Sequence, residues 1–318
     1  MTAIDISCTA AEYWDANHEK AKDPTFWMAH PVCRAAINRR VTGSPHEWPL
    51  QWFRRTRVPV PFGRAVSWGC GTAYFERAAI GLGIAHEIDA LDVSPVSLEK
   101  AREETAREGV TGITFGLCDF NDPRIARRRY DIAFFHASLH HVAALERLFR
   151  RLAVGLTATG RIYIESEFIG PSRDRWRQEY LEVAQALLDL VPEEARLKTR
   201  IEFPIEVKDP SEAIRSGEIE SISRRFFDFE EWRPFGGQLA DLILPCVALG
   251  WANSRDGRRF VDSVMRIEED QLRKDPRSTH YVVAFGRLKP LYRLAPPFAA
   301  QVVIAVRRKA TRLARRQR

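Results

Sequence analysis

Between residues 64 and 168, short apolar runs alternate with longer segments whose apolar residues recur at helical spacing. The short runs predict β-strands at 64–68, 87–93, 112–120, 130–138 and 160–168. The longer segments predict helices at 74–83, 94–109 and 144–156, the second with Ser94 as its N-cap and Pro95 in its first turn. This alternation is typical of an α/β fold, with a doubly wound parallel sheet.

The flanks of this alternation have a different pattern. Residues 1–60 are expected to be helical, and the prolines in their second half predict a loop before the first strand. Residues 174–198 are also expected to be helical, and 211–224 to hold short helical pieces. Two late strands are predicted, near 226–235 and 280–288, with helical stretches between them.

The stretch Val66–Phe75, VSWGCGTAYF, places Gly69 and Gly71 just after the first predicted strand. Such a turn accompanies three classes of nucleotide site. A phosphate loop would continue into Gly-Lys-Ser/Thr, which is absent here. A dinucleotide fingerprint would carry a third small residue where Tyr74 stands. The pattern therefore favours the third class, an S-adenosylmethionine site.

Two acids follow in the order that such a site needs. Asp92 ends the second predicted strand, 21 residues beyond Gly71, which is close to the spacing of a ribose-binding acid. Asp119 ends the third strand and could accept a hydrogen bond from the adenine amino group, while the neighbouring Phe120 covers the ring. Each feature is weak alone, but together and in this order they are fairly specific.

The segments VSWGCGT, LDVSPVSLEKARE, CDFND, YDIAFFHASLHHV and GRIYIESEFIGPSR resemble successive motifs of class I S-adenosylmethionine-dependent methyltransferases, in the bacterial group with a generic small-molecule methyltransferase domain. The resemblance covers roughly residues 64–172. It implies a Rossmann-like seven-stranded sheet whose last strand is antiparallel. The cofactor contacts it implies are Ser67, Gly69, Cys70, Gly71, Asp92, Val93, Asp119 and Phe120, with His136 lining the pocket.

The same resemblance suggests how the chain is divided. The expected parts are an N-terminal helical lid segment (1–60), an S-adenosylmethionine-binding core (61–172), a helical substrate-cap insertion (173–225), the completion of the sheet (226–288) and a basic tail (289–318). The sequence departs from the family at Ala73, where a third glycine is common, and at residues 157–160, which replace a Lys-Pro-Gly-Gly turn.

Candidate chemistry lies after the fourth predicted strand, because ligands of such sheets bind beyond the carboxyl ends of the strands. We expect His140 to be a general base with a pKa suited to neutral pH. Alternatively, His140 and His141 only open the next helix and bond to backbone. Glu165, Glu167 and Arg173 either grip a polar acceptor or form a solvated salt-bridge cluster.

The aromatic pair Tyr13 and Trp14 has two interpretations. It belongs either to an N-terminal helix over the cofactor or to the core packing of that segment. A third reading of the glycine turn, a nicotinamide oxidoreductase, ranks below the methyltransferase.

The net charge of +7 comes from one end of the chain. Residues 289–318 hold nine Lys or Arg and no acid, and removing these nine charges leaves −2 for the remainder. A slightly acidic body gives no footprint for duplex nucleic acid, so no nucleic-acid partner is expected. The end itself, 297–318, either lies on an anionic membrane surface or is a partly disordered, solubilising tail.

The five cysteines are widely spaced, and no Cys/His cluster has metal-ligand spacing, so neither a metal site nor a disulfide framework is expected. With no apolar run long enough to span a bilayer and no secretory signal in the N-terminal residues, a cytoplasmic location is expected, with a possible peripheral position at the inner membrane face.

Together these features predict an S-adenosylmethionine-dependent methyltransferase that acts on a small or carrier-linked acceptor, with oxygen as the expected accepting atom. The alternative is a non-catalytic protein of the same fold that docks a partner or membrane through its ends. The sequence decides neither the acceptor nor the oligomeric state.

Overall fold

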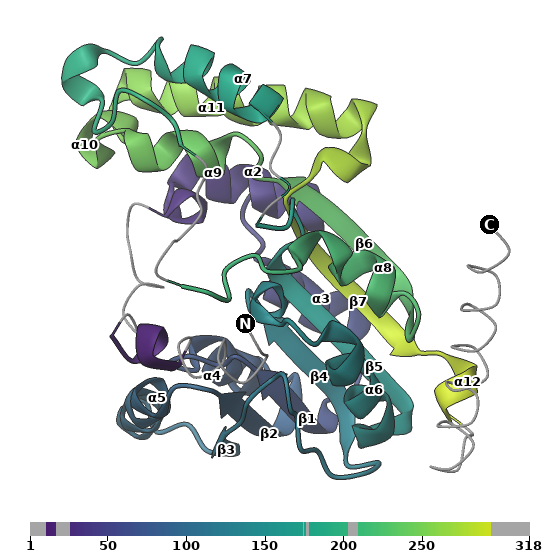
Figure 1. Ribbon diagram of the computed structural model, residues 1–318. Helices are drawn as coiled ribbons and strands as arrows, with labels where there is room; N and C mark the ends of the chain where they lie inside the picture. Colours follow the sequence, from purple (N-terminus) through teal and green to yellow (C-terminus); the bar gives the residue numbers. More distant parts are fainter. Residues whose placement is uncertain (1–10, 17–25, 174, 176–177, 203–208, 294–318) are drawn as a thin grey trace, which may run out of the picture.

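The computed structural model describes residues 11–16, 26–173, 175, 178–202 and 209–293. Its centre is a seven-stranded sheet with strand order β3-β2-β1-β4-β5-β7-β6 (Figure 1). The strands are β1 (Phe62–Trp68), β2 (Ala85–Asp92), β3 (Ile113–Leu117), β4 (Tyr130–His136), β5 (Leu156–Phe168), β6 (Phe227–Gly236) and β7 (Tyr281–Leu288). All seven predicted strands are present.

Strand directions confirm the predicted fold class. β1 pairs in parallel with β2 and β4, as do β2 with β3 and β4 with β5, whereas β7 is antiparallel to both β5 and β6. The prediction for β5 began too late, at residue 160. The strand already starts at Leu156, and the register against β4 shifts between the Tyr130 and Ile132 positions, so residues 157–160 are accommodated as an irregularity inside β5.

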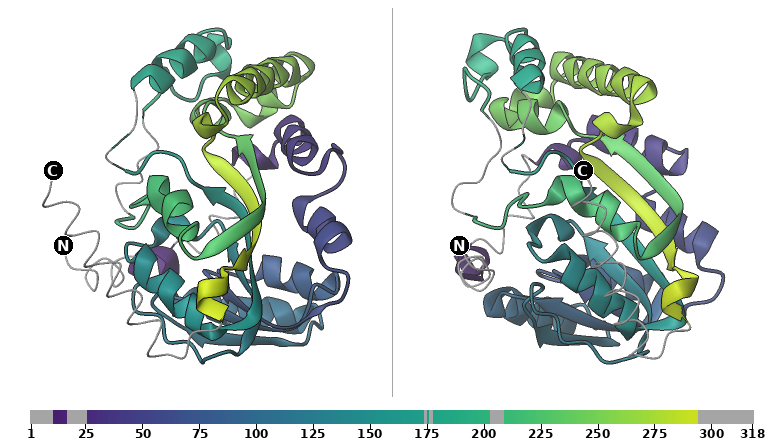
Figure 2. Two further views of the ribbon diagram at one scale, coloured as in Figure 1. Left: turned by 90° about the vertical axis from the view of Figure 1, so that its right-hand side faces the viewer. Right: turned by 45° about the vertical axis from the view of Figure 1, so that its right-hand side comes forward.

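Helices cover both faces of the sheet (Figure 2). The helices between consecutive strands are α4 (Tyr74–Gly81), α5 (Pro95–Arg107) and α6 (Leu145–Gly155), and Ser94 caps α5 as predicted, its Oγ accepting from the N–H of Ser97 at 2.9 Å. One core cluster joins α4 and α5 to helices α2 (Pro31–Thr42) and α3 (Pro49–Arg57). A second cluster joins α6 and α8 (Ile219–Ser223) on the other face.

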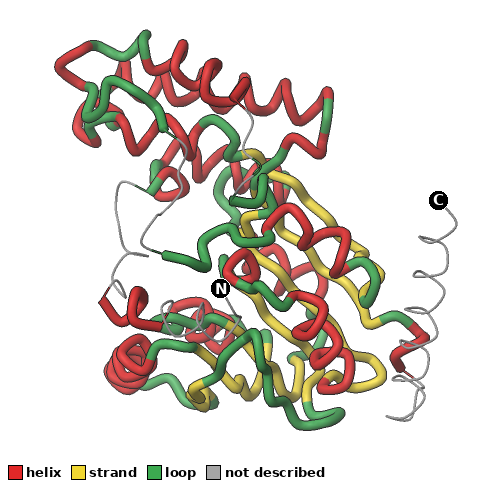
Figure 3. Tube along the Cα trace, in the orientation of Figure 1, coloured by secondary structure: helices red, strands yellow, loops and turns green. Residues whose placement is uncertain are grey.

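A helical layer lies beyond the end of the sheet (Figure 3). It contains α7 (Gln178–Leu188), α9 (Ala240–Ile243), α10 (Leu249–Ala252) and the long α11 (Arg255–Lys274). Of these four helices only α7 lies within the expected insertion 173–225, and it is shorter than the helix predicted over 174–198. The expected loop before β1 is only partly present, because Pro49 occupies the first turn of α3, where a missing N–H costs nothing.

The predicted tail and the predicted absence of a membrane-spanning segment can be compared with the structure only over the described residues. The last described helix is α12 (Pro290–Arg293), and the predicted tail contact at 297–318 lies outside the described residues. Within the described part of the chain, no helix combines the length and apolarity needed to cross a bilayer.

The strand order reverses between β1 and β4, which are neighbours with their connections leaving in opposite directions. In open α/β sheets this switch point opens a crevice outside the carboxyl ends of the strands, where ligands bind. The carboxyl ends of β1, β2, β3 and β4 and the loops that follow them carry the predicted cofactor residues and His140, so the topology brings these residues to one edge.

Candidate functional site

The turn between β1 and α4 needs glycine at Gly69. Its φ is +72°, and a Cβ there would stand 2.5 Å from the Cβ of Ser138. The N–H groups of Gly69 and Cys70 both donate to the carbonyl of Leu91 on the next strand, at 2.8 and 3.1 Å. The turn is therefore bonded to β2 and packed against the residue that follows β4.

At Gly71, glycine is favoured by the backbone conformation and not by close packing. Its φ is +52°, yet an added Cβ would meet nothing within 4 Å, so the backbone faces open space. Its N–H donates to Oδ2 of Asp92 at 2.8 Å, and Oδ1 of Asp92 accepts from the N–H of Ser94 at 2.9 Å. The structure thus joins the glycine turn to the predicted ribose acid. Desolvation raises the pKa of Asp92, against the lowering effect of these backbone hydrogen bonds.

Asp119 and Phe120 lie on the far side of the same turn. Asp119 Oδ1 accepts from the N–H of Asn121 at 2.7 Å, which fixes the loop after β3. The ring of Phe120 packs edge-on against Trp68, with centroids 5.9 Å apart, and approaches within 3.5 Å of the position a Gly69 Cβ would take. Trp68, an unusual residue in a glycine motif, is buried in the core beneath the turn and supports Phe120.

Three further residues implied by the family resemblance lie close to the turn but face the protein. The hydroxyl of Ser67 is buried and donates to Oε1 of Glu76 at 2.5 Å. Cys70 is buried, and desolvation raises the pKa of its thiol well above the usual value. Val93 is half-buried between Asp92 and Ser94.

His136 ends β4 at the same edge of the sheet. Its Nε2 lies 2.7 Å from the hydroxyl of Tyr74, and its ring stacks on Phe75 with centroids 5.3 Å apart. Desolvation lowers the pKa of His136 to about 4, so the ring is neutral at physiological pH. These contacts fit a pocket wall rather than a base.

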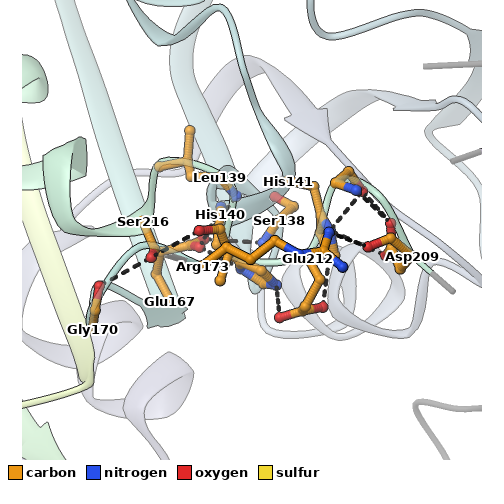
Figure 4. Close-up of polar contacts among 12 residues, drawn as sticks. Ser138, Leu139, His140, His141, Glu167, Gly170, Arg173, Asp209, Glu212 and Ser216 are labelled. Atoms are coloured by element: carbon orange, nitrogen blue, oxygen red, sulfur yellow. Dashed lines mark hydrogen bonds and ion pairs between the residues drawn. The ribbon is translucent and has the colours of Figure 1, made fainter. Parts of the chain in front are cut away.

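His140 lies in a 3₁₀ turn, η3 (Leu139–His141), directly after β4. The carboxylate of Glu167, from β5, accepts from the N–H groups of Ser138, Leu139 and His140, and its Oε1 also lies 2.8 Å from Nδ1 of His140 (Figure 4). Glu167 is fully buried. The reading of Glu167 as part of a solvated cluster is therefore wrong: it caps the turn and orients the imidazole.

The pKa of His140 differs from the expectation of a near-neutral value. Burial alone would lower it, but the hydrogen bond to Glu167 and the negative charges of Glu212 and Asp209 raise the pKa to about 9. At Glu167, desolvation is the largest effect and raises the pKa, but the hydrogen bond and charge of His140 and the backbone N–H groups of Leu139 and Ser138 together outweigh it, so the pKa of that carboxyl is lowered. Once deprotonated, His140 is therefore a stronger proton acceptor than an ordinary histidine.

Residues 209–218 bring acidic groups to this turn that the sequence analysis missed. Oε1 of Glu212 lies 3.8 Å from Nε2 of His140, and its Oε2 lies 4.0 Å from Nε2 of His141 (Figure 4). Nδ1 of His141 lies 3.0 Å from the hydroxyl of Ser211 and 3.5 Å from Oδ2 of Asp209. Only the chain fold places these residues beside the histidines, because they lie about seventy positions further along the sequence.

The loop is fixed from two sides. Arg215 pairs with Glu146 and Glu218, both at 2.8 Å, and donates to the carbonyl of Ala143 at 2.9 Å. Arg173 donates to the backbone carbonyl of Asp209 at 2.8 Å, so it holds the loop rather than standing apart from it. The acidic groups are therefore held against η3 by built-in contacts.

The short helical stretch 11–16 touches both halves of this edge. Oδ1 of Asp15 accepts from the hydroxyl of Ser94 at 2.5 Å, beside Asp92. The ring of Trp14 meets His141 edge-on, with centroids 5.4 Å apart. Of the two interpretations of this aromatic pair, the structure favours a helix lying across the site.

Glu165, the other acid predicted on β5, is buried. Its Oε2 accepts from the hydroxyl of Tyr163 at 2.6 Å, and desolvation raises its pKa to about 7, against the opposing charge of Arg34. A solvated cluster is wrong for this residue as well. Asp131, at the start of β4, accepts hydrogen bonds from the N–H of Arg64 and the hydroxyl of Thr157 and so serves the structure.

A family model described as a methyltransferase domain matches residues 64–220. No curated protein matches the chain. The matched range contains β2 to β5, all of β1 except its first two residues, the glycine turn and all the site residues described above except those of the helical stretch 11–16 and Arg34.

Several solved structures are similar to this chain at low identity. Phosphoethanolamine N-methyltransferase 2 from Haemonchus contortus, in complex with S-adenosyl-L-methionine, is 16% identical with a TM-score of 0.49; the match covers 86% of this chain and 59% of that one. An S-adenosylmethionine-dependent methyltransferase from Mesorhizobium loti is 20% identical, with a TM-score of 0.44 and coverage of 75% and 97%. A complex with the Haloferax volcanii Trm112 methyltransferase activator is 16% identical, with a TM-score of 0.49 and coverage of 87% and 96%.

Proposed function

We propose that this chain, a class I S-adenosylmethionine-dependent methyltransferase, transfers its methyl group to a hydroxyl oxygen of a small or carrier-linked acceptor. The observation that carries the choice of oxygen is the pair His140–Glu167 at the carboxyl edge of β4 and β5. A hydroxyl must lose its proton as the methyl bond forms, and a carboxylate-oriented imidazole is suited to accept that proton.

The residues around the glycine turn fit the cofactor. The open side of Gly71 leaves room for the backbone to approach a ligand, and Asp92 lies directly beside it. Asp119 and Phe120 would hold the adenine, and His136 would line the pocket. Gly69, Cys70 and Val93 would shape the turn through their backbone, and Ser67 would support it through Glu76.

When bound, S-adenosylmethionine supplies an electrophilic methyl group for in-line displacement. The chain's own residues must align the acceptor, exclude water and take a proton. Because its pKa is about 9, His140 must first lose the proton on Nε2; the neutral ring then accepts the hydroxyl proton at Nε2, since Glu167 already occupies Nδ1 and stabilises the imidazolium that results. Residues 11–16 and 209–218 lie on either side of His141 and would shield the acceptor from solvent.

Two measurements test this proposal on the full chain. Isothermal titration calorimetry with S-adenosylmethionine should show one site, and no binding at high micromolar concentration would remove the enzyme assignment. Transfer of a labelled methyl group should then be measured on a panel of hydroxyl, amine and thiol acceptors. Turnover on hydroxyl acceptors that is lost in His140→Gln supports oxygen transfer, whereas turnover confined to amines contradicts it. Cofactor binding without turnover on any acceptor would favour the non-catalytic alternative.

A cytoplasmic location and a peripheral membrane contact remain predictions. Co-sedimentation of the full chain with anionic vesicles, compared with a form ending at Lys289, separates the contribution of the tail from that of the folded core.

A further inference from the structure

Three side chains after β4 point their donor atoms at a common space. One ligand atom from each of His140, His141 and Glu212 lies within 4.8 Å of the other two. The distances from Glu212 to the two Nε2 atoms, 3.8 and 4.0 Å, are too long for hydrogen bonds. Ligand atoms around a tetrahedral zinc ion lie roughly 3.3–3.6 Å apart, since each bond is about 2.0–2.2 Å long, so small side-chain shifts would close the site.

Hydrogen bonds behind the rings decide which nitrogens face this space. A carboxylate only accepts, so Nδ1 of His140 donates to Glu167 and its Nε2 is turned toward Glu212. The hydroxyl of Ser211 donates to Oδ1 of Asp209 at 2.6 Å, so its lone pair faces Nδ1 of His141. That nitrogen is therefore the donor too, and Nε2 of His141 is the atom directed at Glu212.

Both rings thus show the outer-shell arrangement that fixes histidine ligands in metal sites, with Nδ1–H bonded to a carboxylate or to a hydroxyl that is itself bonded to one. Glu167 and Asp209 are fully buried, and the loop that carries Glu212 is fixed by Arg215 and Arg173. Two imidazole nitrogens and one carboxylate are held together before any ligand arrives.

The local charge also favours a cation. The carboxylates of Glu167, Asp209 and Glu212 lie close to the two imidazoles. Among the described residues, Oδ2 of Asp209 is buried without a hydrogen-bond partner. A divalent ion in the space would offset this excess of negative charge.

We propose that His140, His141 and Glu212 bind a first-row transition-metal ion, with Zn²⁺ as the best fit. Two imidazoles and one carboxylate are a donor set typical of zinc with one position left open, whereas Mg²⁺ and Ca²⁺ prefer all-oxygen sites. Metal binding itself does not depend on the proposed function. The effect of the metal on activity does depend on the proposed function. Nε2 of His140 has one lone pair, so bound Zn²⁺ blocks the proton transfer assigned to that atom and suppresses turnover.

The test uses the full chain, stripped of metal with a chelator, and titration calorimetry with Zn²⁺. One tight site is expected, and Co²⁺ in its place should give visible absorption bands. Glu212→Gln should weaken Zn²⁺ binding at least about tenfold, because it removes an anionic ligand. His46→Ala is the matched control, since His46 is exposed and far from the site in sequence, and it should bind as the wild type does. Mg²⁺ at millimolar concentration should not compete.

Circular dichroism of both variants confirms that they are folded. Equal Zn²⁺ affinity in wild type and Glu212→Gln, or loss of the site only in His46→Ala, would overturn the metal site while leaving the methyltransferase assignment intact. Tight Zn²⁺ binding that leaves turnover unchanged would support the metal site and contradict the base role of His140 instead.

Discussion

Oε1 of Glu167 accepts from both the backbone N–H and the ring Nδ1 of His140, at 2.9 and 2.8 Å. One carboxylate on β5 therefore sets the position of the turn after β4 and the direction of the imidazole it carries. Both contacts depend on the same buried negative charge. A change at Glu167 should therefore affect both the stability of the turn and the orientation of the His140 ring.

Glu167→Gln should separate these two roles. An amide oxygen retains some backbone hydrogen bonds but cannot stabilise an imidazolium, so we expect kcat to fall at least about a hundredfold with little change in cofactor affinity. Unfolding free energy should fall by about 1–3 kcal/mol. Steady-state kinetics, calorimetry and urea unfolding measure the three effects.

Glu268→Gln provides the control for that experiment. Glu268 is also fully buried and accepts from the backbone N–H groups of Gly237, Leu239 and Ala240, and its charged partner is Arg40, at 3.3 Å, rather than a histidine. The Glu268→Gln variant should lose about as much unfolding free energy as Glu167→Gln does, and its kcat should remain that of the wild type. An equal loss of kcat in both variants would mean that Glu167 acts only by stabilising the fold.

The sheet and cofactor edge could be predicted from the sequence because their signals are local. The apolar runs, the Gly69–Gly71 turn and the acids at strand ends each lie within a few residues of the element they mark. All these residues do meet at one edge, since parallel strands direct their carboxyl ends the same way. Ser67 shows the limit of this reasoning: its position is right, but its hydroxyl is bonded to Glu76.

The histidine cluster could not be predicted in the same way. Glu212 and Asp209 come from a loop with no periodic pattern, and their position depends on contacts of Arg215 and Arg173 with distant backbone. The pKa of His140 was misjudged for the same reason, because the charges that raise it lie on other elements. Long-range packing, rather than local spacing, determines this chemistry.

The two glycines of the turn should respond differently to alanine. Gly69→Ala combines a positive φ with a Cβ 2.5 Å from Ser138, so we expect a loss of about 2–4 kcal/mol in unfolding free energy. Gly71→Ala has only the φ penalty, about 1–2 kcal/mol, but places a methyl group in the open space beside Asp92. It should weaken S-adenosylmethionine binding more than it weakens the fold. Urea unfolding and calorimetry give both quantities; unchanged cofactor affinity in Gly71→Ala would place the cofactor elsewhere.

Asp92→Ala should weaken cofactor binding severely, by at least about tenfold. It removes the carboxylate proposed to hold the ribose and also the acceptor of the Gly71 N–H. Glu87→Gln, an exposed acid on the same strand, serves as the comparison and should bind the cofactor normally. Calorimetry measures the affinity of both variants for S-adenosylmethionine. If Asp92→Ala binds the cofactor as tightly as Glu87→Gln does, Asp92 supports only the loop after β2.

Glu76→Gln should change how stability depends on pH. Burial raises the pKa of Glu76 from 4.5 to about 7, although its hydrogen bond from Ser67 opposes this. The folded state therefore holds a proton that the unfolded state has lost, and stability falls as pH rises from about 4.5 through 7. The uncharged amide avoids this loss, so the variant should gain on the wild type with rising pH, by up to about 3 kcal/mol above pH 7. Urea unfolding from pH 5 to 8.5 measures the difference, with the exposed Glu103→Gln as control; a difference that is constant with pH would show that Glu76 is ionised throughout.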